Sequence, residues 1–152
     1  MGSQRPQRGF TLVELLVVFA IMALLVGIVP AAFERMREAA QYRDTLRTIQ
    51  SEMRKARRDA IQAGREIRFT VDGQRRVFGV QSGAQHSIPE SLQIRTTVAG
   101  IELSATGVAS IRFLPRGGAT GGSIDVLRER GEGMRLRVDW LTGMVTQEAL
   151  IQ

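Results

Sequence analysis

The chain carries few of the side chains on which enzymes ordinarily depend. His86 is the only histidine, and cysteine is absent from all 152 residues. A Ser-His-Asp triad or a histidine metal pair needs partners at a spacing that the surroundings of His86 do not offer, and thiolate chemistry needs cysteine. We therefore expect no catalytic residue, no metal site and no cofactor, and we interpret His86 as a solvated loop residue.

A glycine-rich stretch has nearly the spacing of a phosphate-binding loop. Gly117 is followed, after four intervening residues, by Gly122 and Ser123. The lysine that reaches the terminal phosphates in such loops is missing, and no acidic strand end is placed to hold magnesium. The pattern therefore favours a flexible hairpin connection over a nucleotide site.

The densest group of arginines is the strongest candidate for a contact with DNA phosphates. It lies around a Gly-rich turn and comprises Arg128, Arg130, Arg135 and Arg137. Glu129 and Glu132 are interspersed among them, whereas phosphate-binding surfaces carry unopposed positive charge. Although the formal net charge is +6, we favour an ordinary charged hairpin and do not expect a nucleic-acid partner.

Glu14 is an acid placed directly before a long apolar run. No charged residue occurs in positions 15–33, and as a helix this stretch would span roughly 28 Å, which matches the hydrocarbon core of a bilayer. An acid within a membrane costs about 2 kcal/mol or more unless a cation pairs with it. Glu14 therefore needs either such a partner or a position at the lipid headgroups. Arg5 and Arg8 precede the run, which keeps this end cytoplasmic and places the rest of the chain on the far side.

A long helix followed by strands must position these residues. Apolar residues recur at intervals of three and four at Ala39, Tyr42, Leu46, Ile49, Met53, Ala56 and Ala60. This spacing predicts an amphipathic helix that continues the apolar segment and ends at Gly64. Pro30 should kink or loosen the helix because proline lacks an amide hydrogen.

Beyond Gly64 the hydrophobic pattern changes to the period of two that is typical of strands. Ile67, Phe69 and Val71 alternate with polar residues before Asp72-Gly73, which predicts a hairpin. Strands are predicted at residues 67–71, 76–80, 92–96, 100–104, 110–114, 123–127, 134–140 and 144–146. The predicted fold class is α+β, a long N-terminal helix packed on an antiparallel β-sheet or small β-sandwich. The lone aromatics Tyr42 and Trp140 are expected to pack in the core or between helix and sheet.

The residues around Glu14 carry a family resemblance. The stretch Arg8-Gly9-Phe10-Thr11-Leu12-Val13-Glu14-Leu15 resembles the class III signal of type IV pilins and pseudopilins. In that family a prepilin peptidase cleaves after the glycine, here Gly9, and usually methylates the new terminal residue, here Phe10. The resemblance implies that Glu14 guides assembly by pairing with the amino terminus of a neighbouring subunit, and that the fold is pilin-like.

Two C-terminal stretches narrow the resemblance. Residues 111–124 and 138–145 are similar to the GspH/FimT family of minor pseudopilins, and residues 46–64 agree with the end of that family's helix. This implies a non-enzymatic structural subunit of the type II secretion pseudopilus, which takes part in protein export across the outer membrane. The implied partners are the prepilin peptidase, other major and minor pseudopilins, the inner membrane and, as further candidates, the secreted protein substrates.

The predicted organisation follows from these features. Residues 1–9 form a leader, 10–33 a transmembrane or filament-core helix, 34–64 an amphipathic helix, and 65–152 a periplasmic β domain, so that the chain crosses the inner membrane once. Two alternatives stay open. One is a FimT-like minor pilin that binds DNA during uptake through residues 128–137. The other is a soluble periplasmic binding protein released by ordinary signal peptidase after Val29-Pro30-Ala31.

Overall fold

The structure is a computed structural model, which describes residues 10–98 and 107–150, and gives only the backbone for residues 26–32. It contains one helix, α1 (Leu12–Ala63), ahead of the strands. The strands are β1 (Ile67–Asp72), β2 (Val77–Val80), β3 (Gln85–Ser87), β4 (Leu92–Thr97), β5 (Val108–Phe113), β6 (Gly122–Arg128), β7 (Gly133–Val138) and β8 (Val145–Leu150). The chain divides into two compact units, residues 1–38 and 39–152. The α+β prediction is confirmed.

Local chemistry defines both ends of α1. Thr11 precedes the helix, and its Oγ1 accepts a hydrogen bond from the backbone N–H of Glu14 at 3.2 Å. One of the amides that lack a partner in the first turn is thereby satisfied. At the other end Gly64 adopts a φ of 62°, the left-handed conformation that ends many helices. The helix continues through Pro30, so the predicted loosening there does not end it.

The first part of α1 carries its apolar side chains in exposed positions, as at Phe19 and Leu24. Among the residues that the structure describes, no helical stretch is both long and apolar enough to cross a membrane. The predicted span at residues 10–33 is therefore not confirmed, and the side chains of residues 26–32 lie outside the described part.

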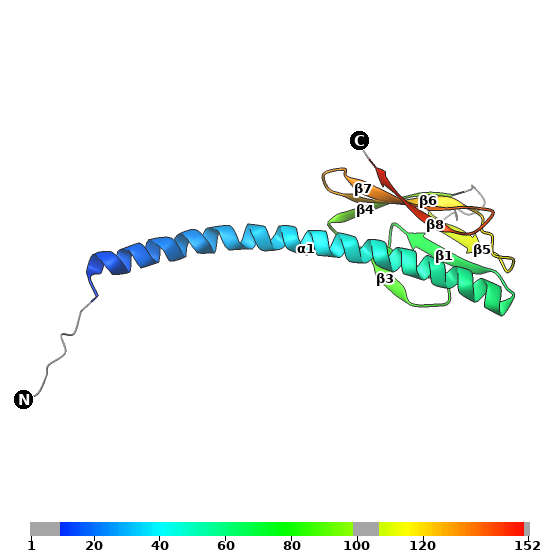
Figure 1. The fold of residues 1–152 in the computed structure, drawn as a ribbon, viewed down its shortest axis with the longest axis horizontal. Coiled ribbons are helices and arrows are strands. Elements are labelled where there is room, and N and C mark those ends of the chain that lie inside the picture. Colours follow the sequence, from blue (N-terminus) through cyan, green and yellow to red (C-terminus); the bar gives the residue numbers. More distant parts are fainter. Residues whose placement is uncertain (1–9, 99–106, 151–152) are drawn as a thin grey trace, which may run out of the picture. The chain divides into compact units, whose positions relative to one another are not determined.

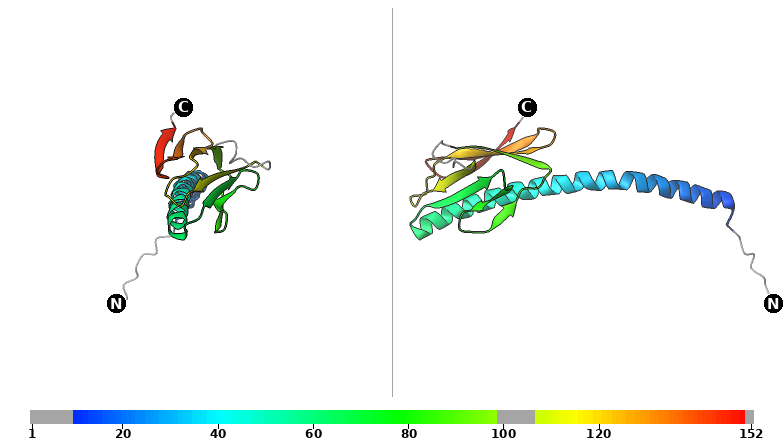
Figure 2. Two further views of the ribbon diagram at one scale, coloured as in Figure 1. Left: turned by 90° about the vertical axis from the view of Figure 1, so that its right-hand side faces the viewer. Right: turned by 180° about the vertical axis from the view of Figure 1, so that it is seen from behind.

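The strands form two four-stranded antiparallel sheets (Figures 1 and 2). The first sheet has the order β3-β2-β1-β5 and the second has the order β4-β6-β7-β8. Phe69 in β1 lies opposite both Val80 in β2 and Ile111 in β5, and Ile124 in β6 lies opposite Leu136 in β7. Along β1 and β5, buried residues alternate with partly exposed ones, which is what a sheet with one covered face requires.

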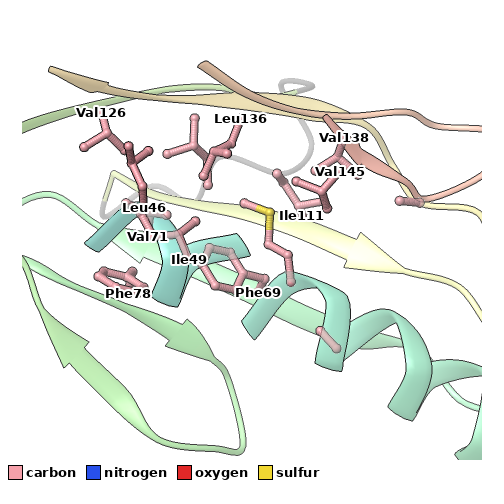
Figure 3. Close-up of a cluster of buried hydrophobic side chains, with 14 of the residues drawn as sticks. Leu46, Ile49, Phe69, Val71, Phe78, Ile111, Val126, Leu136, Val138 and Val145 are labelled. Atoms are coloured by element: carbon pink, nitrogen blue, oxygen red, sulfur yellow. The ribbon is translucent and has the colours of Figure 1, made fainter. Parts of the chain in front are cut away.

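One hydrophobic cluster joins the second part of α1 to both sheets (Figure 3). The helix contributes the predicted apolar face, and Ile49 and Met53 are fully buried. Burying a side chain of this size stabilises the fold by about 1.5–3 kcal/mol. The sheets contribute Phe69, Val71, Phe78, Ile111 and Phe113 from the first and Ile124, Val126, Leu136, Val138 and Val145 from the second. The amphipathic helix predicted from the sequence is confirmed, although Ala39 at its edge is only half-buried.

Most predicted strands are confirmed within two residues at each end, whereas β3 and β8 differ by more. Strand β3 was not predicted, because three residues are too short for a period of two to be recognised. Strand β7 ends at Val138 rather than at Trp140, and β8 continues to Leu150 rather than ending at Thr146. The strand predicted at 100–104 lies outside the described residues.

Candidate functional site

The predicted processing site lies at the start of α1. Gly9 is outside the described residues, and Phe10 precedes the helix with 78% of its surface exposed. Thr11 and Glu14 have the Thr-x-x-Glu spacing of a capping box, and the Thr11 half of that box is formed. The contribution of Thr11 was missed at the sequence level, although its spacing to Glu14 is a recognisable signal.

Glu14 lies in the first turn of α1 and is exposed. An acid in this position interacts favourably with the positive end of the helix dipole. Within residues 10–98 and 107–150, Glu14 forms no ion pair. Its carboxylate is therefore accessible to a cation supplied from outside the described part of the chain.

Arg57 connects α1 to two connections between strands that lie far away in the sequence. Its Nε donates to the backbone carbonyl of Gly117 at 3.0 Å and to that of Thr142 at 2.9 Å. Gly117 and Thr142 belong to the two C-terminal stretches that carry the family resemblance. Hydrogen bonds from a charged donor are stronger than those between neutral groups. Arg57 is thus an anchor at which the helix and both stretches meet.

The glycine-rich stretch is not the simple hairpin connection that was predicted. Strands β5 and β6 belong to different sheets, so residues 114–121 carry the chain from one sheet to the other. A short antiparallel bridge between Phe113 and Ala119 is the part that resembles a hairpin. A side chain at Gly118 would place its Cβ 2.9 Å from the carbonyl oxygen of Trp140. Glycine is needed here for close backbone approach rather than for binding phosphate.

The turn between β7 and β8 is held by Asp139. Its Oδ1 accepts hydrogen bonds from the backbone N–H of Leu141 at 3.1 Å, and from the N–H and Oγ1 of Thr142 at 2.8 Å each. The hydrogen bonds from Thr142, then the one from Leu141, lower the pKa of the Asp139 carboxyl from 3.8. The turn directs Trp140 outward with 66% of its surface exposed. The prediction that Trp140 packs in the core is wrong, because β7 ends before it.

The four arginines considered for DNA do not form one unopposed surface. The Arg128 guanidinium lies 4.2 Å from the centre of the Tyr42 ring, a cation–π contact, and the prediction that Tyr42 packs in the core is confirmed. Arg135 makes two hydrogen bonds, of 2.7 and 2.8 Å, with Asp125 on β6. Arg130 and Arg137 are exposed.

His86 lies in β3 and not in a solvated loop. Its ring stacks on Phe78 with 5.4 Å between ring centres, and its Nε2 lies 3.8 Å from Oε1 of Glu52 on α1. The cross-strand pairing of Phe78 with His86 accounts for the stacking. In the described part of the chain, no group of three or more His, Cys, Asp or Glu residues could hold a metal ion.

A capped helix start, and a helix packed on two antiparallel sheets, are the features of the class of pilin-like proteins. The prokaryotic N-terminal methylation motif matches residues 4–30, and the family described as type II transport protein GspH matches residues 45–143. The chain belongs to the GspH family and is a minor pseudopilin of the type II secretion class. A family of structural subunits and a methylation signal indicate a membrane-anchored chain that faces the periplasm.

Named relatives agree with this membership. The chain is 32% identical over 142 residues to the type II secretion system protein H of Xanthomonas campestris pv. campestris, with 93% of this chain and 83% of that protein covered. The minor pseudopilin EpsH of Vibrio cholerae is similar in structure with a TM-score of 0.57 at 16% identity, covering 72% of this chain and 97% of EpsH. The type IV minor pilin FimU of Pseudomonas aeruginosa has a TM-score of 0.53 at 14% identity, covering 77% and 95%. At these identities the two structures show the fold alone.

Proposed function

We propose that this chain is a structural subunit that a prepilin peptidase cleaves after Gly9 and methylates on Phe10. Residues 10–33 then anchor it once in the inner membrane, with the β domain in the periplasm, until it assembles with other major and minor pseudopilins to drive export of secreted proteins. The observation that carries the proposal is the accessible Phe10 directly before a capped helix whose first turn holds Glu14.

Glu14 and the new amino terminus have complementary charges. Cleavage leaves the Phe10 amine four residues from Glu14, at the helix end whose dipole already favours the carboxylate and disfavours a cation. An ammonium group is better paired with the Glu14 carboxylate of a neighbouring subunit, where both charges are neutralised in an apolar setting. The ion pair is strong there because the local dielectric is low, and an unpaired Glu14 would resist burial.

The exposed apolar side chains of α1 supply the driving force for assembly. Packing with equivalent helices removes surface such as that of Phe19 and Leu24 from water or lipid, and burial from water contributes about 25 cal/mol per Å². The β domain stays attached to the helix through the shared core and the Arg57 anchor. A force applied to the helix can therefore be transmitted to the attached β domain.

The mature amino terminus tests the proposal. Mass spectrometry of the chain from cells with an active prepilin peptidase should find methylated Phe10 as the first residue, and cells without the peptidase should retain the leader. An amino terminus at Ala32 would refute the proposal and support the soluble alternative. Deletion of the gene should abolish release of secreted proteins into the medium, and re-expression of the wild-type chain should restore it.

A further inference from the structure

The exposed large hydrophobic side chains of the second unit lie on two neighbouring segments, the end of α1 and the turn between β7 and β8. Within the described residues of unit 39–152 they are Ile61, Trp140, Leu141 and Met144, exposed by 44%, 66%, 68% and 59%. We call these four residues the turn patch. A Cβ at Gly117 would lie 3.6 Å from Ile61 Cδ1, and a Cβ at Gly118 would lie 2.9 and 3.1 Å from the carbonyl oxygens of Trp140 and Leu141. The adjacent residues Gly117 and Gly118 thus bring the helix end and the turn together.

The turn that carries three of these side chains is rigid. Asp139 accepts three hydrogen bonds within it, and its backbone N–H donates to the carbonyl of Met144 at 3.0 Å. Arg57 fixes Thr142 to the helix. A side chain held in place before binding loses less entropy when a partner arrives. Exposed Trp and Met on such a support are typical of the centre of a protein–protein contact.

Basic residues of α1 lie beside the turn patch. Gln50, Arg54, Arg57, Arg58 and Ile61 follow helical spacing along one stripe. The stripe faces β8 and the turn, because Gln147 Nε2 donates to Gln50 Oε1 at 3.2 Å and Arg57 donates to Thr142. Arg54 and Arg58 are exposed, as is Arg116 next to Gly117. The acidic residue of the turn is Asp139, and its Oδ1 already accepts hydrogen bonds from Leu141 and Thr142 within the turn.

Arg54, Arg58 and Arg116 form an arginine rim around the turn patch. We infer that the turn patch and this arginine rim form a docking surface for a segment of a different pseudopilin in the same filament, and that this segment is acidic and carries an apolar anchor. The inference rests on the proposed function, which supplies such neighbours. If two copies of this chain met through the turn patch, the arginines of one copy would face those of the other, and the repulsion between like charges would oppose association. A lipid-binding cluster typically carries about four to eight basic residues, whereas this rim has three exposed arginines and an acid among them.

Site-specific photo-crosslinking in cells tests the docking surface. The full chain, expressed with its secretion system, carries p-benzoylphenylalanine in place of Leu141, and a control chain carries it in place of Gln74, which is exposed on the β1–β2 turn. We expect Leu141 to yield an adduct with another pilin-like subunit at a segment rich in Asp and Glu, and Gln74 to yield none with that segment.

Charge reversal adds a matched comparison. Arg54→Glu with Arg58→Glu should lower the yield of the Leu141 adduct about tenfold, because like charges at an interface rim oppose association. Lys55→Glu makes the same kind of change on the same helix, away from the stripe, and should leave the yield unchanged. Equal yields in the two variants would overturn the inference. So would an adduct with a second copy, with lipid, or with a segment that lacks an acidic surplus.

The same strains separate this inference from the proposed function. If deletion of the gene leaves secretion intact, the proposed function fails. If deletion abolishes secretion and the Leu141 adduct is absent or insensitive to charge reversal, only the docking surface fails.

Discussion

Replacing Arg57 with alanine tests whether the anchor between helix and sheets contributes to stability. The substitution removes the Nε donor shared by the carbonyls of Gly117 and Thr142. Both carbonyls then lose a charged donor at positions that are partly shielded by the turn and the helix. Gly143 packs closely against Gly117 and Arg57, since a Cβ at Gly143 would lie 3.0 Å from Arg57 Nε, so the backbone has little room to shift toward another donor.

The magnitude follows from the geometry. A hydrogen bond to a charged group contributes about 1.5–3 kcal/mol when it is buried. Here one N–H is shared between two acceptors, and one of the two contacts is exposed, so we expect a loss of about 2 kcal/mol in the free energy of unfolding rather than twice that. For a domain of this size such a loss lowers Tm by roughly 6–12 °C.

Urea unfolding of the full chain in detergent, followed by circular dichroism, measures the effect. Arg58→Ala is the matched control, because Arg58 is an exposed neighbour and its loss should change stability by less than about 0.5 kcal/mol. Trp140 is the only tryptophan, so its fluorescence reports separately on the turn. If Arg57→Ala costs no more than Arg58→Ala, the anchor contributes nothing to stability and the reasoning fails.

Three further predictions concern the helix start, the turn and DNA. Thr11→Ala should destabilise the first turn of α1 by about 1 kcal/mol through loss of the cap; faster amide hydrogen exchange at Glu14 would show this, and unchanged exchange would contradict it. Asp139 has a folded-state pKa below 3.8, so its contribution to stability is present above that value and is lost as pH falls through the folded pKa. The urea midpoint of the wild type should therefore exceed that of Asp139→Asn at pH 6, and the difference should narrow as pH falls below 3.8; a difference that stays constant would show that the charge of Asp139 does not contribute to stability. The full chain should show no DNA binding at low salt, and binding that weakens steeply as salt rises would favour the DNA-uptake alternative.

Much of the fold could be predicted because its signals are local. The spacing from Tyr42 to Ala60 predicts a buried helix face, and α1 buries that face. Alternation at Ile67, Phe69 and Val71 likewise predicts β1. These patterns report the helical and strand periods directly, and they need no knowledge of which segments later come together.

The relation between strands could not be predicted in the same way. The glycine stretch suggests a turn, and the sequence does not indicate whether β5 and β6 pair or belong to different sheets. His86 looked like a loop residue because its strand is short and its partner, Phe78, is known only once β2 and β3 are paired. Strand pairing depends on long-range competition among segments of similar propensity, which spacing along the chain does not encode.

The amino-acid sequence by itself determined the motif around Gly9, Phe10 and Glu14, the apolar face of the helix and the family resemblance. Each of these features consists of residues that are adjacent or regularly spaced along the chain. Tertiary structure alone decided that Arg57 joins two stretches that lie 60 and 85 positions away. It also decided that Trp140 points outward beside the end of α1, and that Arg128 and Arg135 are engaged within the domain. Such contacts depend on the distances between side chains in the folded state, and those distances exist only after the helix and both sheets have packed around one core.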